Sequence, residues 1–108
     1  SQRVEYRLAS ADSNPYLAMS AALGSGLWGI ENKIEPTKSI NEAVEKQGIK
    51  QLPSSLGDAS HSLRKSKVAK LLFGSEFIEH FCTTRGKEEE LHRNHVDEWQ
   101  LQRYFEII

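Results

Sequence analysis

A chain of 108 residues has room for one domain, and its 38% hydrophobic and 27% charged residues are typical of a globular protein with a packed core. The net charge of −1 excludes the basic excess of a general nucleic-acid binder. No apolar run approaches the length that spans a bilayer, and the single cysteine, Cys82, cannot form an internal disulfide. We therefore expect a cytoplasmic protein whose partners include neither nucleic acid nor membrane.

The first element expected is a strand over residues 3–8, where charged and apolar side chains alternate. A single strand is not stable alone, and no second convincing strand follows it in the sequence. The chain also begins at Ser1 rather than at a methionine. We interpret it as the C-terminal piece of a larger protein that supplies the partner strands.

A long helix is expected next, over residues 14–33. Asn14 is a good N-cap, and Pro15 suits the first helical position because its missing N–H needs no partner there. Apolar or small residues surround most of this helix, which predicts deep burial. Three glycines in its interior each cost roughly 1 kcal/mol relative to alanine, so close packing against another backbone is expected there. They are Gly24, Gly26 and Gly29.

The rest of the chain is expected to be helical. Serines at capping positions, glycines at stop positions and apolar residues at helical spacing predict short helices over 39–46, 55–65 and 66–73. A longer helix, capped by Ser75, is expected to reach about Leu91, and Asn94 is expected to cap a last helix. The fold class is therefore mainly α, with one N-terminal strand followed by five or six helices.

Arg3, Glu5 and Arg7 form the candidate site. Strand geometry places these three side chains on one face, with neighbours roughly 6.5 to 7 Å apart. A carboxylate can bind Mg²⁺, and each guanidinium can offer paired donors to a phosphoryl or carboxylate group. Alternating charges also occur on solvated strand faces with weak ion pairs, so the residues alone leave both interpretations open.

The sequence resembles the C-terminal part of the glutamine synthetase family. An Arg-x-Glu-x-Arg strand is followed by an Asn-Pro-Tyr-Leu helix that ends in Gly-Leu-Trp-Gly-Ile. Further similarity lies at Leu52-Pro53, Leu72-Phe73-Gly74 and Val96-x-x-Trp99, so the resemblance covers nearly the whole chain. It implies that residues 1–108 are an incomplete, C-terminal segment of an α+β catalytic domain.

The resemblance implies a role for each residue of the candidate site. Arg3 would contact ATP phosphate, Glu5 would bind Mg²⁺ or Mn²⁺, and Arg7 would hold glutamate and the phosphoryl group. In that family, ATP phosphorylates the γ-carboxylate of glutamate and an amine then displaces phosphate to form an amide. The resemblance also implies a ring-shaped homo-oligomer, and the segment alone is expected to be inactive.

Some departures from the family pattern favour the branch that joins glutamate to polyamines such as putrescine. Residues 8–13 lack the proline that ammonia-using members commonly have, and Trp28 stands where many have aspartate. No tyrosine lies in the 40s or 50s, and the ending 103–106 also resembles that branch. Ammonia and a polyamine are thus both candidate amines.

Two other interpretations of the sequence concern its helices and its histidines. A helical assembly module or a non-catalytic relative would share most of these features, but would have no need of a carboxylate between two arginines. The histidines and Cys82 lack the spacing of a zinc site, so capping or surface histidines and a packing cysteine are expected instead. The histidines are His61, His80, His92 and His95.

Overall fold

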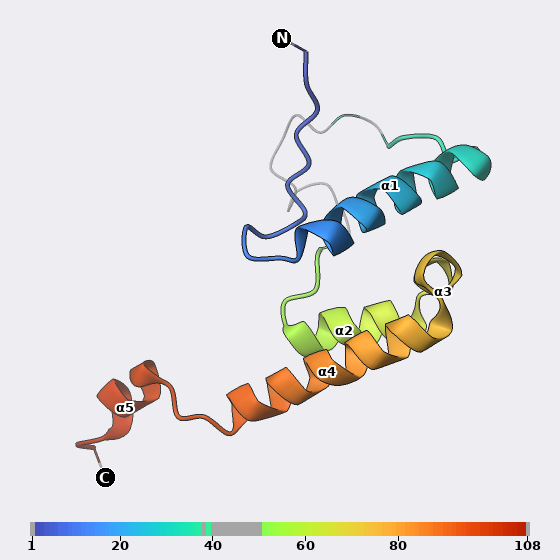
Figure 1. The fold of residues 1–108 in the computed structure, drawn as a ribbon. Helices are drawn as coiled ribbons and strands as arrows, with labels where there is room; N and C mark the ends of the chain where they lie inside the picture. Colours follow the sequence, from blue (N-terminus) through green and yellow to red (C-terminus); the bar gives the residue numbers. More distant parts are fainter. Residues whose placement is uncertain (1, 38, 40–50, 108) are drawn as a thin grey trace. The chain divides into compact units, whose positions relative to one another are not determined.

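The computed structural model describes residues 2–37, 39 and 51–107. The mainly helical fold is confirmed: these ranges hold five helices (Figure 1). They are α1 (Pro15–Glu31), α2 (Leu56–Lys65), α3 (Lys67–Phe73), α4 (Ser75–Arg93) and α5 (Glu98–Tyr104). The chain divides into two units, Ser1–Ala43 with α1 and Val44–Ile108 with α2 to α5. The helix expected over 39–46 lies outside the described residues.

Helix α1 begins where the sequence predicts. The Asn14 side chain accepts hydrogen bonds from the backbone N–H groups of Tyr16 (3.0 Å) and Leu17 (3.3 Å), and Pro15 occupies the first turn. The helix ends at Glu31, and Asn32 donates its side-chain amide to the Trp28 carbonyl at 2.8 Å. Neighbouring residues therefore satisfy some of the polar backbone groups at both ends.

The deep burial expected for α1 is wrong for the described chain. None of its residues is buried, and Leu23 is 66% exposed and Ile30 76% exposed. A Cβ atom at Gly26 or Gly29 would meet nothing within 4 Å. The physical reason is that, within the unit that holds α1, the described residues supply no second helix or strand to cover its apolar surface.

The strand expected over residues 3–8 is not formed in the described part of the chain. These residues are exposed and lack regular secondary structure, with Val4 97% exposed. A strand is defined by hydrogen bonds to a neighbouring strand, and the described ranges contain no strand that could provide them. Sequence alternation alone therefore does not produce the element.

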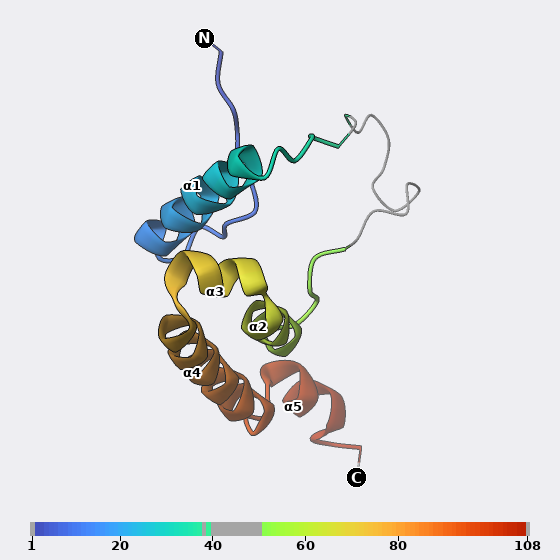
Figure 2. The ribbon, with the colours of Figure 1, turned by 90° about the vertical axis from the view of Figure 1, so that its right-hand side faces the viewer.

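The core of the second unit lies between α2 and α4, which run side by side in opposite directions (Figures 1 and 2). Ile78 and Cys82 of α4 are each 1% exposed. The Ser60 hydroxyl donates to the Cys82 carbonyl at 3.2 Å, and the Cys82 thiol donates to the Ser60 carbonyl at 3.4 Å. This pair of hydrogen bonds ties the two helices together at mid-length.

Polar contacts continue on either side of that core. Near the end of α2, Arg64 Nε lies 3.1 Å from Glu79 Oε1, and Arg64 Nη2 donates to the Thr83 hydroxyl at 3.2 Å. Near its start, Gly57 lies against the Glu89 side chain, which is only 20% exposed. Both ends of α2 are thus fixed on α4.

Gly74 joins α3 directly to α4. Its φ of 82° ends α3, and it is also the N-cap of α4. The expectation that Ser75 caps this helix is wrong, because Ser75 is already its first residue and no side-chain cap is formed. Helix α4 then continues through Gly86 to Arg93, since the hydrogen-bonded ladder tolerates one interior glycine.

Helix α5 starts later than expected. Asn94 is the C-cap of α4 rather than the N-cap of α5. Asp97 caps α5 in a capping box: its carboxylate accepts from the Gln100 N–H at 2.7 Å, and the Gln100 side chain accepts from the Asp97 N–H at 3.4 Å. The reciprocal pair satisfies two backbone donors, the N–H groups of Asp97 and Gln100.

Candidate functional site

Two residues of the candidate site, Glu5 and Arg7, are in direct contact. Arg7 Nη2 donates to Glu5 Oε2 at 3.0 Å, and Arg7 Nε lies 3.0 Å from Glu5 Oε1. The guanidinium therefore forms a fork across both carboxylate oxygens, the geometry in which arginine pairs most strongly with a carboxylate. The side chains are 62% and 81% exposed, so this ion pair lies in solvent.

Arg3, the third member, is exposed and makes no ion pair with any residue in the described ranges. The structure thus brings together Glu5 and Arg7 but leaves Arg3 apart from them. Because Glu5 lies two residues from each arginine, the sequence alone gives no reason for it to pair with one rather than the other.

A turn connects this segment to α1. The Ser13 N–H donates to the Ser10 carbonyl at 3.1 Å, and the Ser10 hydroxyl donates to the Asp12 carboxylate. The bond from Ser10, with a smaller contribution from the backbone N–H of Asp12 itself, lowers the pKa of the Asp12 carboxyl below its ordinary value. Asp12 is fully exposed, so the turn shapes the backbone without forming a pocket.

The donor chemistry at Glu5 fits a hard divalent cation, but one carboxylate is not a complete site. Among the described residues, no group of three or more His, Cys, Asp or Glu side chains lies close enough to hold a metal ion. Any cation bound by Glu5 would need further ligands from outside these residues. Cys82 is buried between α2 and α4, which confirms its expected packing role.

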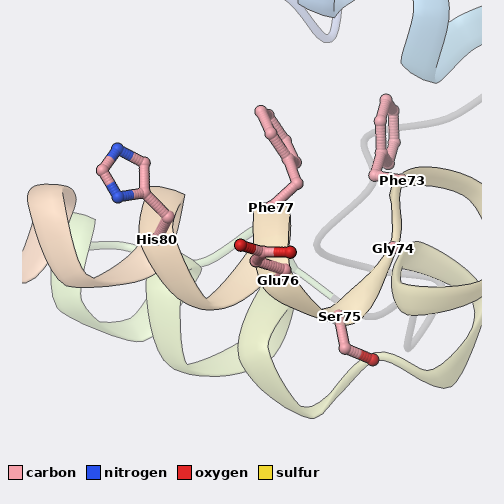
Figure 3. Close-up of a pocket in the computed structure, with 6 residues that line it drawn as sticks. All are labelled: Phe73, Gly74, Ser75, Glu76, Phe77 and His80. Atoms are coloured by element: carbon pink, nitrogen blue, oxygen red, sulfur yellow. The ribbon is translucent and has the colours of Figure 1, made fainter.

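An open depression lies where α3 meets α4, lined by Phe73, Gly74, Ser75, Glu76, Phe77 and His80 (Figure 3). Phe73, Phe77 and His80 project from the same side of the helices, whereas Ser75 points away (Figure 3). This depression is not among the sites predicted from the sequence. The sequence pattern that could have predicted it is the series of phenylalanines four residues apart, the spacing that aligns side chains along one helix face.

The phenylalanines of this surface form a continuous row. The ring centroids of Phe73 and Phe77 are 5.8 Å apart, as are those of Phe77 and Phe81. The Arg85 guanidinium lies 5.5 Å from the Phe81 ring centroid, a cation–π contact that closes the row. Phenylalanine carries no nucleophilic or acid–base chemistry, and the side chains lining the depression that can titrate are Glu76 and His80.

The sequence profile of the glutamine synthetase catalytic domain matches residues 1–104, which is nearly the whole chain. The chain belongs to the glutamine synthetase family. The resemblance seen in the sequence is thereby confirmed at the level of the family.

Three curated relatives support this assignment: two are named glutamine synthetases and one is named a glutamate–amine ligase. The chain is 39% identical over 111 residues to type-1 glutamine synthetase 2 of Dictyostelium discoideum, covering 98% of the chain and 21% of that protein. It is 39% identical over 109 residues to glutamate–isopropylamine ligase of a Pseudomonas species, covering 98% and 24%. It is 39% identical over 123 residues to glutamine synthetase of Pyrococcus furiosus, covering 95% and 28%.

The chain therefore spans about a quarter of the length of the curated relatives it matches. None of its described helices has the length and apolar character needed to cross a membrane.

Proposed function

We propose that this chain forms the C-terminal part of the catalytic domain of an ATP-dependent glutamate–amine ligase. The observation that carries the proposal is the family match over residues 1–104, which includes the Arg3-Glu5-Arg7 segment. The isolated segment is proposed to be inactive, because it spans about a quarter of its relatives and has one candidate metal carboxylate. The active form would be a homo-oligomer of the longer protein.

The family match leads us to propose a role for each site residue, and each role agrees with the chemistry of its side chain. Arg3 binds ATP phosphate, and Arg7 holds the glutamate carboxylate and the phosphoryl group passing to it, because a guanidinium pairs with oxyanions through two donors. Glu5 would bind Mg²⁺ or Mn²⁺ through its carboxylate oxygens. A bound cation would supply positive charge that stabilises phosphoryl oxygens. These residues therefore position and neutralise charge rather than form covalent bonds.

The amine is the open part of this proposal. Relatives named for glutamine synthesis and for isopropylamine are both 39% identical to the chain, so overall identity does not select an amine. Trp28 and residues 8–13 lead us to propose an amine larger than ammonia, of the putrescine class. One relative already bears the name of an amine other than ammonia.

The test is phosphate release by the longer protein that carries this segment, with ATP, Mg²⁺, glutamate and either ammonia, isopropylamine or putrescine. We expect release with an amine, and the amine giving the highest kcat/KM identifies the branch. Glu5→Ala should abolish magnesium-dependent release, whereas the matched Glu35→Ala, at another exposed carboxylate, should retain it. Equal activity of the two variants would remove the metal role from Glu5.

A second candidate function is a non-catalytic helical assembly module. It is favoured by the exposed apolar residues of α1, such as Leu23 and Ile30, which would associate with another surface. Absence of phosphate release with all three amines, in a longer protein that assembles into a defined oligomer by light scattering, would favour this function over the ligase.

A further inference from the structure

The Arg7 guanidinium already holds a carboxylate in this structure. Its Nη2 donates to Glu5 Oε2 at 3.0 Å, and its Nε lies 3.0 Å from Glu5 Oε1. An external carboxylate or phosphoryl group would bind through the same paired donors, the side-on edge of the guanidinium. Glu5 therefore occupies the position that an oxyanion ligand of Arg7 would take.

Glu5 also matches such a ligand in its chemistry. Its side chain ends in a γ-carboxylate, the group that free glutamate would present as the substrate proposed above. The Glu5 and Arg7 side chains are 62% and 81% exposed, so an anion in solution can reach the guanidinium and exchange with Glu5.

We propose that Glu5 is an internal competitor at the side-on edge of Arg7, so that a carboxylate or phosphoryl ligand binds there only by displacing the Glu5 carboxylate. The inference rests on the proposed function in one respect, because it takes Arg7 as an oxyanion ligand. It adds an autoinhibitory contact in which Glu5 acts through Arg7 as a positioning residue. By linkage, a bound oxyanion weakens the Arg7–Glu5 contact by the same factor that Glu5 weakens oxyanion binding.

Arg3 provides the contrast that isolates this effect. Arg3 and Arg7 each lie two residues from Glu5, so the charge of Glu5 repels an anion at either arginine to a similar extent. Arg3 makes no ion pair with any residue in the described ranges, whereas both oxygens of Glu5 contact Arg7. Removing the Glu5 charge should strengthen anion binding at both arginines, with an additional gain at Arg7 from the freed donors. That additional gain is expected to be about two- to fivefold, because exposed ion pairs are weak.

The experiment uses the full 108-residue chain with inorganic phosphate and, separately, glutamate as probes at constant ionic strength. NMR follows the Nε–H signals of Arg3 and Arg7 during each titration, in the wild-type chain, in Glu5→Gln and in the matched Glu35→Gln. We expect Glu5→Gln to raise the anion affinity at Arg7 about two- to fivefold more than at Arg3, and Glu35→Gln to leave both unchanged. The anion with the larger additional gain identifies whether this edge suits a phosphoryl group or a carboxylate.

Arg7 also has an end-on edge, formed by Nη1 and Nη2. An oxyanion that bound at that edge would leave the contact with Glu5 intact, and Glu5→Gln would then raise the affinity equally at the two arginines. Equal gains, or a larger gain at Arg3, would overturn the competition, as would an Arg7 signal that responds to neither anion in Glu5→Gln. These results would leave the ligase proposal in place, since phosphate release by the longer protein tests it independently.

Discussion

Helices α1 and α4 are close in length, at 17 and 19 residues, yet they have opposite environments. Helix α4 buries Ile78 and Cys82 against α2, while α1 buries no residue despite its more apolar sequence. Both helices are regular because caps, propensity and backbone hydrogen bonds are local. Burial depends on a partner, and most helical stability in proteins comes from tertiary packing. Helix formation is thus determined by residues within the segment, whereas burial of the helix requires a second element to pack against it.

The largest expected effect is at the α2–α4 core. Ile78→Ala removes a side chain that is 1% exposed and should reduce the free energy of unfolding of this helix pair by about 2–5 kcal/mol. The matched change in α1, Leu23→Ala, removes a side chain that is 66% exposed and should change stability by less than about 0.5 kcal/mol. Amide hydrogen exchange, read helix by helix, measures both. Equal losses in the two helices would mean that α1 is covered in solution.

The next largest effects are expected at two glycines. Gly74→Ala places a side chain at φ 82° and should destabilise the α3–α4 junction by about 1–3 kcal/mol. Gly26→Ala adds a methyl group that meets nothing within 4 Å and should stabilise α1 by about 1 kcal/mol. Amide exchange should become slower in α1 with Gly26→Ala and faster in α4 with Gly74→Ala. Destabilisation of α1 by Gly26→Ala would indicate a close neighbour at that glycine.

A smaller effect is expected where Gly57 meets Glu89. A Cβ at position 57 would lie 2.6 Å from Glu89 Oε1, so the carboxylate must move and its 2.8 Å contact with Arg93 must adjust. The helical preference for alanine offsets this cost, and Gly57→Ala alone should be nearly neutral. In a Glu89→Ala background the same change should stabilise the protein by up to about 1 kcal/mol. Additive effects in this double-mutant cycle would show that Glu89 does not constrain Gly57.

The smallest effect is expected in the turn before α1. The Ser10 hydroxyl and the Asp12 backbone lower the pKa of Asp12 in the folded chain. A lowered carboxyl pKa stabilises the fold above the ordinary pKa, and this contribution disappears as the pH falls through the folded value. Ser10→Ala should return the Asp12 pKa towards its ordinary value, as measured by the pH dependence of its carboxyl carbon shift. An unchanged pKa would show that the turn is not populated in solution.

Local signals predicted much of the helical pattern from the sequence. Asn14 with Pro15, Ser55 and Ser66 all cap helices where expected, because a capping side chain bonds to backbone within three residues. Errors arose where neighbouring polar residues competed. Asp97 rather than Asn94 caps α5, because only Asp97 has a glutamine three residues later that completes the reciprocal bonds.

Features that depend on distant residues could not be predicted in the same way. The strand over 3–8 and the burial of α1 both require partner elements. Sequence periodicity indicates which face would be covered, but it does not identify the element that covers it. The site shows the same limit: alternation predicted that Glu5 and Arg7 share a side, but not that Glu5 would pair with Arg7 rather than Arg3. The phenylalanine row had a visible four-residue spacing but no motif that assigned it a role.

The position of Cys82 makes its thiol a probe for the transient separation of α2 from α4. It is the single thiol and is 1% exposed, held against Ser60 by two hydrogen bonds. A thiol reagent can reach it only while α2 and α4 are apart, so the rate of alkylation measures how often the two helices separate. The same burial protects the sulfur from peroxide between openings, which ties the oxidative lifetime of the chain to the opening frequency of one helix pair.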